Sequence, residues 1–398
     1  MRIKGNLQLM KEINTAMIMN LLHRSGRITR AELTKMTKLS ATTVSVLIEQ
    51  LMAKNFVEEV GEKPSSGAGR RAISLQINKN GGYVIGISIG NQSLICAVMN
   101  LHGQCITEMK TTIAIGNDSL AEQINAALKD CMNQVESLNA ELIMGIGIST
   151  PGIIDENEET VLYSSFLKLS NFNLRKQISE VFPNVPVRIV NDSNAAAFAE
   201  HYFGAGKDKS SLLYLTINEG IGAGIILNSQ IHSGYNGAAG EIGHIPVDPN
   251  GKICNCGQIG CVETVLTSPF ILNKCQFLAK EQGLAIPESF DEVIARYEEG
   301  ESWLEPVFDH IISVTRLTIA STVNFISPEV VVLEGWMNRS AKLTEKLRAA
   351  LESFPFPFKF TRERVLQASF GEKGALYGSA TLMLQKIFSA SVLDSHGG

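Results

Sequence analysis

A group of cysteines preceded by a histidine is the clearest chemical feature of this 398-residue sequence. Cys254, Cys256 and Cys261 fall within eight positions, and His244 stands ten residues before the first of them. One imidazole and three thiolates form a closed tetrahedral set of the kind that holds structural zinc. The Cys-x-Cys pair is tighter than the usual zinc spacing, so a loop with free thiols is the alternative. The residue types favour a structural zinc site, with zinc as the cofactor.

Carboxylates and an amide elsewhere in the sequence are further candidates for ligand binding. Glu241 and Glu263 flank the cysteine loop, so a metal that fixes the loop would also fix both carboxylates. Asn191 and Asp192 follow an apolar strand pattern, and the carboxyl end of a strand is where open α/β sheets bind ligands. Such groups form paired hydrogen bonds with vicinal hydroxyls, which suits a sugar. For Asp192, capping of the following helix is the alternative.

The first 80 residues have the charge of a nucleic-acid-binding module. They carry 13 Lys and Arg against six Asp and Glu, a net charge of +7, whereas the remaining residues have a net charge of −12. A basic segment joined to an acidic body is typical of a DNA-binding head on a sensing or catalytic domain. The length suits two or three domains.

Apolar periodicity predicts three helices in this head. The first ends at a serine and a glycine that suit a helix C-terminus. The second begins at Thr29 with a capping box that Glu32 completes, and it points Leu33 and Met36 inward. The third runs over 41–52, and its outer face carries small polar side chains that can reach phosphates and base edges in a major groove. The candidate DNA contacts on this helix are Thr42, Thr43 and Ser45.

A hairpin wing is predicted after the third helix. Residues 56–60 and 73–77 alternate like two paired strands. The loop between them ends in Arg70 and Arg71, which are placed for phosphates or a narrow minor groove. Together these elements predict a winged helix-turn-helix domain, and the alternative is an interaction domain with a solvated basic loop.

The body that follows alternates strands with helices, which predicts an α/β fold. Two apolar strand patterns lie at 84–90 and 94–99, and a similar pair lies at 212–217 and 222–227. Such an internal duplication predicts two similar lobes around a cleft.

Three motifs of the body are specific enough for comparison with a known family. They read Val190-Asn191-Asp192-Ser193-Asn194-Ala195-Ala196-Ala197, Gly240-Glu241-Ile242-Gly243-His244, and Cys254-Asn255-Cys256-Gly257-Gln258-Ile259-Gly260-Cys261-Val262-Glu263. They closely resemble the ROK family (repressors, open reading frames and kinases). The resemblance spans about residues 83–384. With the head and its Gly69-Arg70-Arg71 wing it points to the repressor branch, similar to xylose and N-acetylglucosamine repressors.

This resemblance implies a fold and a set of site residues. The implied fold is an N-terminal winged helix-turn-helix followed by an actin-like (ribonuclease-H-like) duplicated two-lobe domain. The implied domains are the head at 1–80, a first lobe at 81–191 completed by a C-terminal helix at 375–390, and a second lobe at 192–374 that contains the zinc loop. The implied sugar-binding residues are Asn191, Asp192, Glu241, His244 and Glu263. The implied zinc ligands are His244, Cys254, Cys256 and Cys261.

The nucleotide elements of the family's kinases are altered here. Their first glycine-rich hairpin, Asp-x-Gly-Gly-Thr, reads Ser88-Ile89-Gly90-Asn91-Gln92. The second reads Asn218-Glu219-Gly220, and Glu219 places a negative charge where phosphate would lie, which opposes nucleotide binding. A glycine pair near the adenosine is replaced by Gly335-Trp336. These departures indicate a sensor and not an enzyme.

The sequence therefore predicts a sugar-responsive DNA-binding transcriptional repressor of carbohydrate-utilisation genes. Its expected partners are double-stranded operator DNA and a monosaccharide effector, and a homodimer or homotetramer is expected because palindromic operators mirror protein symmetry. One alternative is an ATP-dependent sugar kinase of the same family, and another is a repressor controlled by a protein partner.

Composition excludes several other classes of protein. With 44% hydrophobic and 19% charged residues the chain can bury a core, which argues against a disordered protein. It shows neither a membrane span nor a signal peptide, so a cytoplasmic protein is expected. The four cysteines outside the cluster, expected to be small buried residues, are Cys96, Cys105, Cys131 and Cys275.

Overall fold

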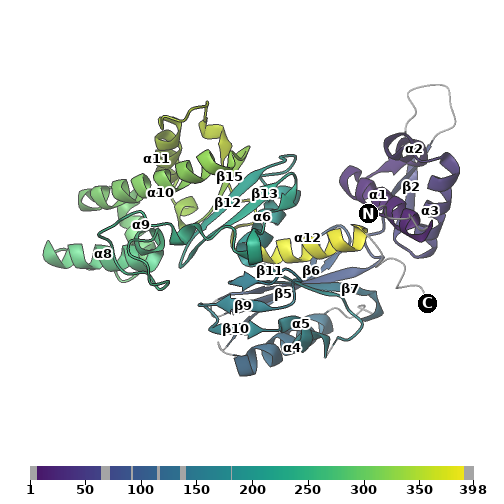
Figure 1. Cartoon of the computed structure of the whole chain (residues 1–398), viewed down its shortest axis with the longest axis horizontal. Coiled ribbons are helices and arrows are strands. Elements are labelled where there is room, and N and C mark those ends of the chain that lie inside the picture. Colours follow the sequence, from purple (N-terminus) through teal and green to yellow (C-terminus); the bar gives the residue numbers. More distant parts are fainter. Residues whose placement is uncertain are drawn as a thin grey trace. The chain divides into compact units, whose positions relative to one another are not determined.

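The computed structural model describes residues 7–63, 72–90, 93–113, 117–134, 140–180 and 182–389 (Figure 1). The chain divides into two compact units, residues 1–190 with 379–398 and residues 191–378. The first unit contains the head and one lobe, and the second contains the other lobe. The domain limits proposed from the sequence differ slightly from these units and remain predictions.

The head is the three-helix and hairpin arrangement that the sequence predicts. Its helices are α1 (Leu7–Ser25), α2 (Arg30–Thr37) and α3 (Ala41–Ala53). Its strands are β1 (Ile28–Thr29), β2 (Val57–Lys63) and β3 (Ala72–Ile77), in the order β1-β3-β2. The antiparallel pair β2–β3 is the stem of the predicted wing.

Local capping interactions explain where α2 and α3 begin. The Thr29 hydroxyl accepts the Glu32 N–H (3.2 Å), and the Glu32 carboxylate accepts the Thr29 N–H (2.9 Å), which confirms the capping box. The Ser40 hydroxyl accepts the Thr43 N–H (3.1 Å) at the start of α3. These bonds satisfy N–H groups that have no partner within the helix, so each cap fixes where its helix begins.

One predicted core position of the head is wrong. Leu33 is fully buried, but Met36 is 56% exposed. The buried face of α2 is narrow, and Leu33 together with Thr37 makes up that face. Met36 lies one turn away at the edge of the covered face.

The first lobe has a mixed five-stranded sheet. Its elements are β4 (Tyr83–Ile89), β5 (Ser93–Asn100), β6 (Cys105–Thr112), α4 (Asn117–Asn133), β7 (Ile143–Thr150), α5 (Leu174–Ser179) and β11 (Val187–Asn191), with the sheet order β11-β7-β4-β5-β6. A small separate sheet contains β8 (Ile153–Ile154), β9 (Val161–Ser164) and β10 (Leu169–Phe172). The strand β4 pairs antiparallel with β5 and parallel with β7.

The second lobe repeats this topology. Its elements are α6 (Asp192–Tyr202), β12 (Leu212–Ile217), β13 (Ile221–Leu227), β14 (Gln230–Ile231), α7 (Glu263–Leu266), α8 (Ser268–Glu281), α9 (Phe290–Glu298), α10 (Glu305–Ile326), β15 (Val330–Gly335), α11 (Ala341–Glu352) and β16 (Val365–Gln367), with the sheet order β14-β13-β12-β15-β16. The last helix, α12 (Gly374–Ser389), begins in this unit and ends in the first one. The strand β12 pairs antiparallel with β13 and parallel with β15, as β4 does with β5 and β7. The predicted duplicated α/β fold is confirmed.

Each lobe has an apolar core between its sheet and helices. Three of the four cysteines outside the cluster are buried, as predicted, but Cys105 is exposed. Cys105 begins the edge strand β6, on which no residue is fully buried. An edge strand that meets solvent on one side does not bury a small thiol in the way a central strand does.

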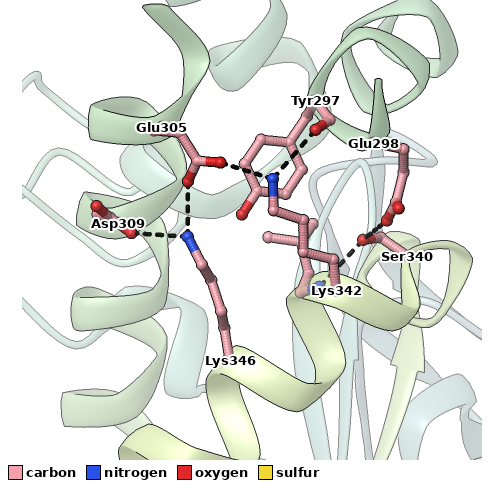
Figure 2. A network of polar contacts seen from close by, with 8 residues as sticks. Tyr297, Glu298, Glu305, Asp309, Ser340, Lys342 and Lys346 are labelled. Atoms are coloured by element: carbon pink, nitrogen blue, oxygen red, sulfur yellow. Dashed lines mark hydrogen bonds and ion pairs between the residues drawn. The ribbon is translucent and has the colours of Figure 1, made fainter. Parts of the chain in front are cut away.

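A charged group holds α11 against α10 in the second lobe (Figure 2). The Lys342 and Lys346 ammonium groups each donate to one oxygen of Glu305, at 2.6 and 2.7 Å. Lys346 also reaches Asp309 (3.2 Å), and the Lys342 ammonium lies 3.9 Å from the centre of the Tyr297 ring. Because these charges are about one-third exposed or more, the network orients the helices more than it stabilises them.

Among the residues described, no helix combines the length and the apolar character needed to cross a membrane.

Candidate functional site

The outer face of α3 carries the side chains predicted to contact DNA. Val44, Leu47, Ile48 and Leu51 are buried against the rest of the head. Thr42 is exposed, and Thr43 and Ser45 are partly exposed on the other side. The Thr43 hydroxyl also lies 2.8 Å from that of Ser40, so it shares in the cap. The predicted wing residues Arg70 and Arg71 lie outside the described residues.

The four predicted metal ligands converge in the second unit. The ligand atoms of His244, Cys254, Cys256 and Cys261 all lie within 4.8 Å of one another. His244 ends a short 3-10 helix, Ile242–His244, and the cysteines lie on the loop that follows. Two bridges fold that loop back on itself, Pro246 with Cys261 and Ile253 with Ile259. The arrangement can hold one metal ion.

Two of the spacings between these ligand atoms match tetrahedral zinc. The Cys256 and Cys261 sulfurs are 3.6 Å apart, and the Cys254 sulfur is 3.7 Å from His244 Nδ1. Zinc–sulfur bonds of about 2.3 Å and a zinc–nitrogen bond of about 2.0 Å place tetrahedral ligand atoms roughly 3.5 to 3.8 Å apart. Nδ1 is thus the ring nitrogen that faces the metal position.

The loop depends on glycine where its chain turns back. Gly260 has φ +71°, and a Cβ at this position would lie 1.6 Å from the carbonyl oxygen of Asp248. Only glycine permits that close approach of two backbone segments. Next to this turn, burial first and then the neighbouring thiols raise the pKa of Cys261 to about 12. A bound cation is what would hold this sulfur as a thiolate near neutral pH.

Two carboxylates flank the histidine of this group. An oxygen of Glu241 lies 3.7 Å from His244 Nε2, the nitrogen that faces away from the cysteines. An oxygen of Glu263 lies 3.8 Å from Nδ1 and 3.6 Å from the Cys254 sulfur. A carboxylate that orients a metal-bound imidazole is a common outer partner of zinc sites. Metal ligands and carboxylates therefore share one local structure.

Asn191 and Asp192 take different roles at the start of α6. Asn191 is the cap residue, and its side-chain oxygen accepts the Asn194 N–H (3.1 Å). Asp192 is the first helical residue, and its Oδ1 accepts the Ser193 N–H (2.7 Å). Capping, the alternative considered for Asp192, is thus performed by Asn191.

The Asp192 carboxylate belongs to an acidic neighbourhood. Burial raises the pKa of Asp192, although its bond from the Ser193 N–H acts in the other direction. Burial also raises the pKa of Glu241, and the negative charges of Asp192 and Glu263 add to that rise while His244 opposes it. Three carboxylates with mutual repulsion favour a ligand that donates hydrogen bonds to them, as a polyol does.

Most of the chain matches known protein families. Residues 84–386 match the ROK family, and residues 13–58 match a winged helix-turn-helix DNA-binding family. The chain belongs to the ROK family. The expected fold, a winged helix-turn-helix followed by an actin-like duplicated domain, is confirmed for this ROK protein by these matches and by the repeated sheets.

Three ROK proteins show how far the similarity extends. The xylose repressor of Caldicellulosiruptor bescii is 30% identical over an alignment 397 residues long, which covers 97% of this chain and 98% of the repressor. The structure of a ROK transcriptional regulator, a homologue of the E. coli MLC protein, has a TM-score of 0.83 at 24% identity and covers 97% of this chain and 98% of its own. A ROK glucokinase from Streptomyces griseus has a TM-score of 0.65 at 23% identity and covers 76% of this chain and 99% of its own.

A hydrogen-bonded carboxylate stands at the carboxyl edge of the second sheet of this ROK protein. Glu334 on β15 is 8% exposed and accepts from the Thr216 hydroxyl (2.6 Å) and from the Asn218 amide (3.0 Å). Burial raises the pKa of Glu334, and the charge of Glu372 adds to the rise. The tip of the β12–β13 hairpin is therefore tied to β15 by the chain's own side chains.

Sequence reasoning missed these interactions. Glu334 stands out in the sequence as an acid at the end of an apolar strand, which is a signal of a ligand edge or of an internal hydrogen bond. Its donors lie 116 and 118 residues away in the sequence, so only the parallel pairing of β12 with β15 reveals them.

Proposed function

We propose that this ROK protein is a sugar-responsive DNA-binding transcriptional repressor of carbohydrate-utilisation genes. The observation that carries the proposal is a DNA-binding head joined to a carboxylate-lined site in a chain whose whole length resembles a xylose repressor. The head would bind operator DNA, and a monosaccharide in the body would alter that binding.

The effector site is built from the amide and carboxylates beside the metal ligands. The residues proposed to bind the monosaccharide are Asn191, Asp192, Glu241, His244 and Glu263. Support comes from their proximity in the second unit and from their hydrogen-bonding chemistry. Zinc would be held by His244, Cys254, Cys256 and Cys261, where it stabilises the loop and leaves His244 Nε2 facing Glu241.

The DNA-binding surface would combine α3 and the wing. Thr42, Thr43 and Ser45 are the proposed contacts on the helix, and Arg70 and Arg71 are the proposed contacts on the wing. We expect a homodimer or homotetramer because two heads read the two halves of a palindromic operator. We expect a protein with this task to work in the cytoplasm, where operator DNA is accessible.

The kinase alternative is disfavoured by the edge of the second sheet. Phosphoryl transfer depends on positioning the phosphates and neutralising their charge. Here Glu334 occupies the carboxyl edge of β15 and binds Asn218 at the hairpin tip, and Glu219 adds a negative charge beside it.

The alternative of a controlling protein partner is tested by a pull-down with and without sugar.

The wing prediction tests the DNA-binding part of the proposal. A duplex selected from a random pool by the full chain should bind the double variant Arg70→Ala/Arg71→Ala more weakly than wild type. The slope of log K against log salt should become less negative by up to about 1.8, because each phosphate neutralised contributes about −0.9. Binding is measured by fluorescence anisotropy across a salt series.

The matched control is Lys280→Ala/Lys359→Ala, which removes the same charge at two exposed positions of the body. It should leave the slope unchanged. An unaltered slope in the arginine variant would show that the wing does not contact the backbone. If the wild-type protein enriches no duplex from the random pool, the proposed function itself is contradicted.

A further inference from the structure

The helix α12 belongs to both compact units. It runs without a break from Gly374 to Ser389 (Figure 1), yet the boundary between the units falls inside it, between Gly378 and Ser379. A continuous helix keeps a rise of about 1.5 Å per residue, so its two parts move as one stiff body. Any displacement imposed on its start is carried to its end.

The start of α12 lies directly against α6 in the second unit. A Cβ on Gly378 would lie 1.8 Å from the carbonyl oxygen of Ala195, and one on Gly374 would lie 3.1 Å from the Ala196 side chain. At Gly378 the two helix backbones therefore touch with no side chain between them, and at Gly374 only the Ala196 methyl group separates them. Ala195 is only three residues after Asp192, so a shift of the α6 N-terminus acts on α12 directly.

The middle of α12 is anchored to the sheet of the first unit. A Cβ on Gly147 of β7 would lie 2.1 Å from the carbonyl oxygen of Ser379, and the Ser379 hydroxyl donates to the carbonyl of Ile87 on β4 (3.3 Å). Two residues earlier on β7, Gly145 faces the Met383 side chain. The close contact with α6 is thus followed, one residue later, by a close contact with β7.

The end of α12 contacts the DNA-binding head. Phe388 is fully buried, and its ring centre lies 5.1 Å from that of His23 on α1. Beside it, His102 Nε2 lies 2.7 Å from the carbonyl oxygen of Ile77, the last residue of the wing strand β3. Burial, with the nearby His102 and Arg24, lowers the pKa of His23 to about 4, so the ring facing Phe388 is neutral at physiological pH.

We propose that α12 is the element that transmits the state of the sugar site to the DNA-binding head, with the Phe388–His23 contact as its output end. This inference rests on the proposed function. The glycine contacts form its input end, because a movement of the backbone of α6 there has no flexible side chain to absorb it. The distance from Gly378 to Phe388 is about 15 Å along the helix.

The first test needs neither sugar nor DNA. Gly378→Ala should displace the start of α12, and Phe388→Ala should remove its output contact. Amide hydrogen exchange in α1 should become at least about tenfold faster in both variants. The double variant should exchange no faster than Phe388→Ala alone, because the effect of Gly378 passes through Phe388. Unchanged exchange of α1 in Gly378→Ala would overturn the proposal.

The second test measures coupling. Its probes are the duplex selected by the full chain and whichever of D-xylose, N-acetyl-D-glucosamine and D-glucose gives the largest thermal shift. In Phe388→Ala the sugar should change duplex affinity by less than about twofold, while the affinities for sugar alone and duplex alone stay within about threefold of wild type. Retention of the full sugar effect would refute the transmission role.

Ile387→Ala is the matched control, since Ile387 is the fully buried neighbour of Phe388 on the same helix. It should lower the melting temperature and keep both the slow exchange of α1 and the sugar effect. If Gly378→Ala does not fold, the proposal is judged by comparing α1 hydrogen exchange and the sugar effect in Phe388→Ala with those in Ile387→Ala. Equal behaviour of these two variants would overturn it. If no sugar changes the duplex affinity of the wild-type protein, the proposed function fails. Hydrogen exchange of α1 in the Gly378 and Phe388 variants still tests whether α12 connects α6 to the head.

Discussion

Cys256→Ser is expected to release the bound zinc and to weaken sugar binding by roughly 10- to 100-fold. Cys256 is exposed, so replacement of its sulfur by oxygen would ordinarily change the free energy of unfolding by less than about 0.5 kcal/mol. If its thiolate is one of four zinc ligands, the loss is at least about 2 kcal/mol, because metal binding and folding of the loop are one equilibrium. Glu241 and Glu263 then lose the fixed histidine between them.

The measurements are zinc content by mass spectrometry, sugar affinity by calorimetry and the unfolding free energy. Cys105→Ser is the control, since Cys105 is also exposed and lies on the first lobe outside the cluster. It should keep one zinc per chain and unchanged sugar affinity. Wild-type protein purified without chelator that contains no zinc would contradict the metal assignment, as would full zinc retention by Cys256→Ser.

Asp192→Asn is expected to reduce sugar affinity by about 10- to 150-fold while duplex binding without sugar stays within about twofold of wild type. A hydrogen bond from a sugar hydroxyl to a charged carboxylate contributes about 1.5–3 kcal/mol, and an amide of the same shape loses most of it. The substitution should not destabilise the fold, because burial raises the pKa of Asp192. A carboxyl with a raised pKa makes its charged form costly, and this cost grows as the pH rises through that pKa.

The control for this variant is Asp208→Asn, which neutralises an exposed carboxylate of the same unit. It should leave sugar affinity unchanged, as calorimetry will show. If Asp192→Asn binds sugar as tightly as wild type, the carboxylate does not contact the ligand. If the variant unfolds, Asp192 is needed for the fold. The assignment of a structural role to the cap residue Asn191 and a ligand role to Asp192 would then be wrong.

The head was the part most open to prediction, since its elements depend on local interactions. The capping box of Thr29 and the cap at Ser40 need only residues three positions apart, so the sequence contains the whole interaction. The position of Met36 could not be predicted in the same way. Helical periodicity defines a face, but the width of that face depends on what packs against it.

The sequence predicts which residues belong to the candidate site better than it predicts their roles and contacts. Asn and Asp are both good helix caps, and only the backbone conformation assigns that task to Asn191. The metal ligands lie within 18 residues of one another and are recognisable by type. In contrast, the bonds to Glu334 and the contact of Phe388 with His23 join distant segments. No local pattern encodes these pairs.

The measurement that tests the central claim most directly is the affinity of the full chain for its selected duplex with and without saturating sugar, and of the sugar with and without duplex. Sugar should weaken duplex binding by about 5- to 150-fold, and duplex should weaken sugar binding by the same factor, because coupling between two sites is reciprocal. Equal affinities in the presence and absence of the other ligand, with both ligands binding, would contradict the account.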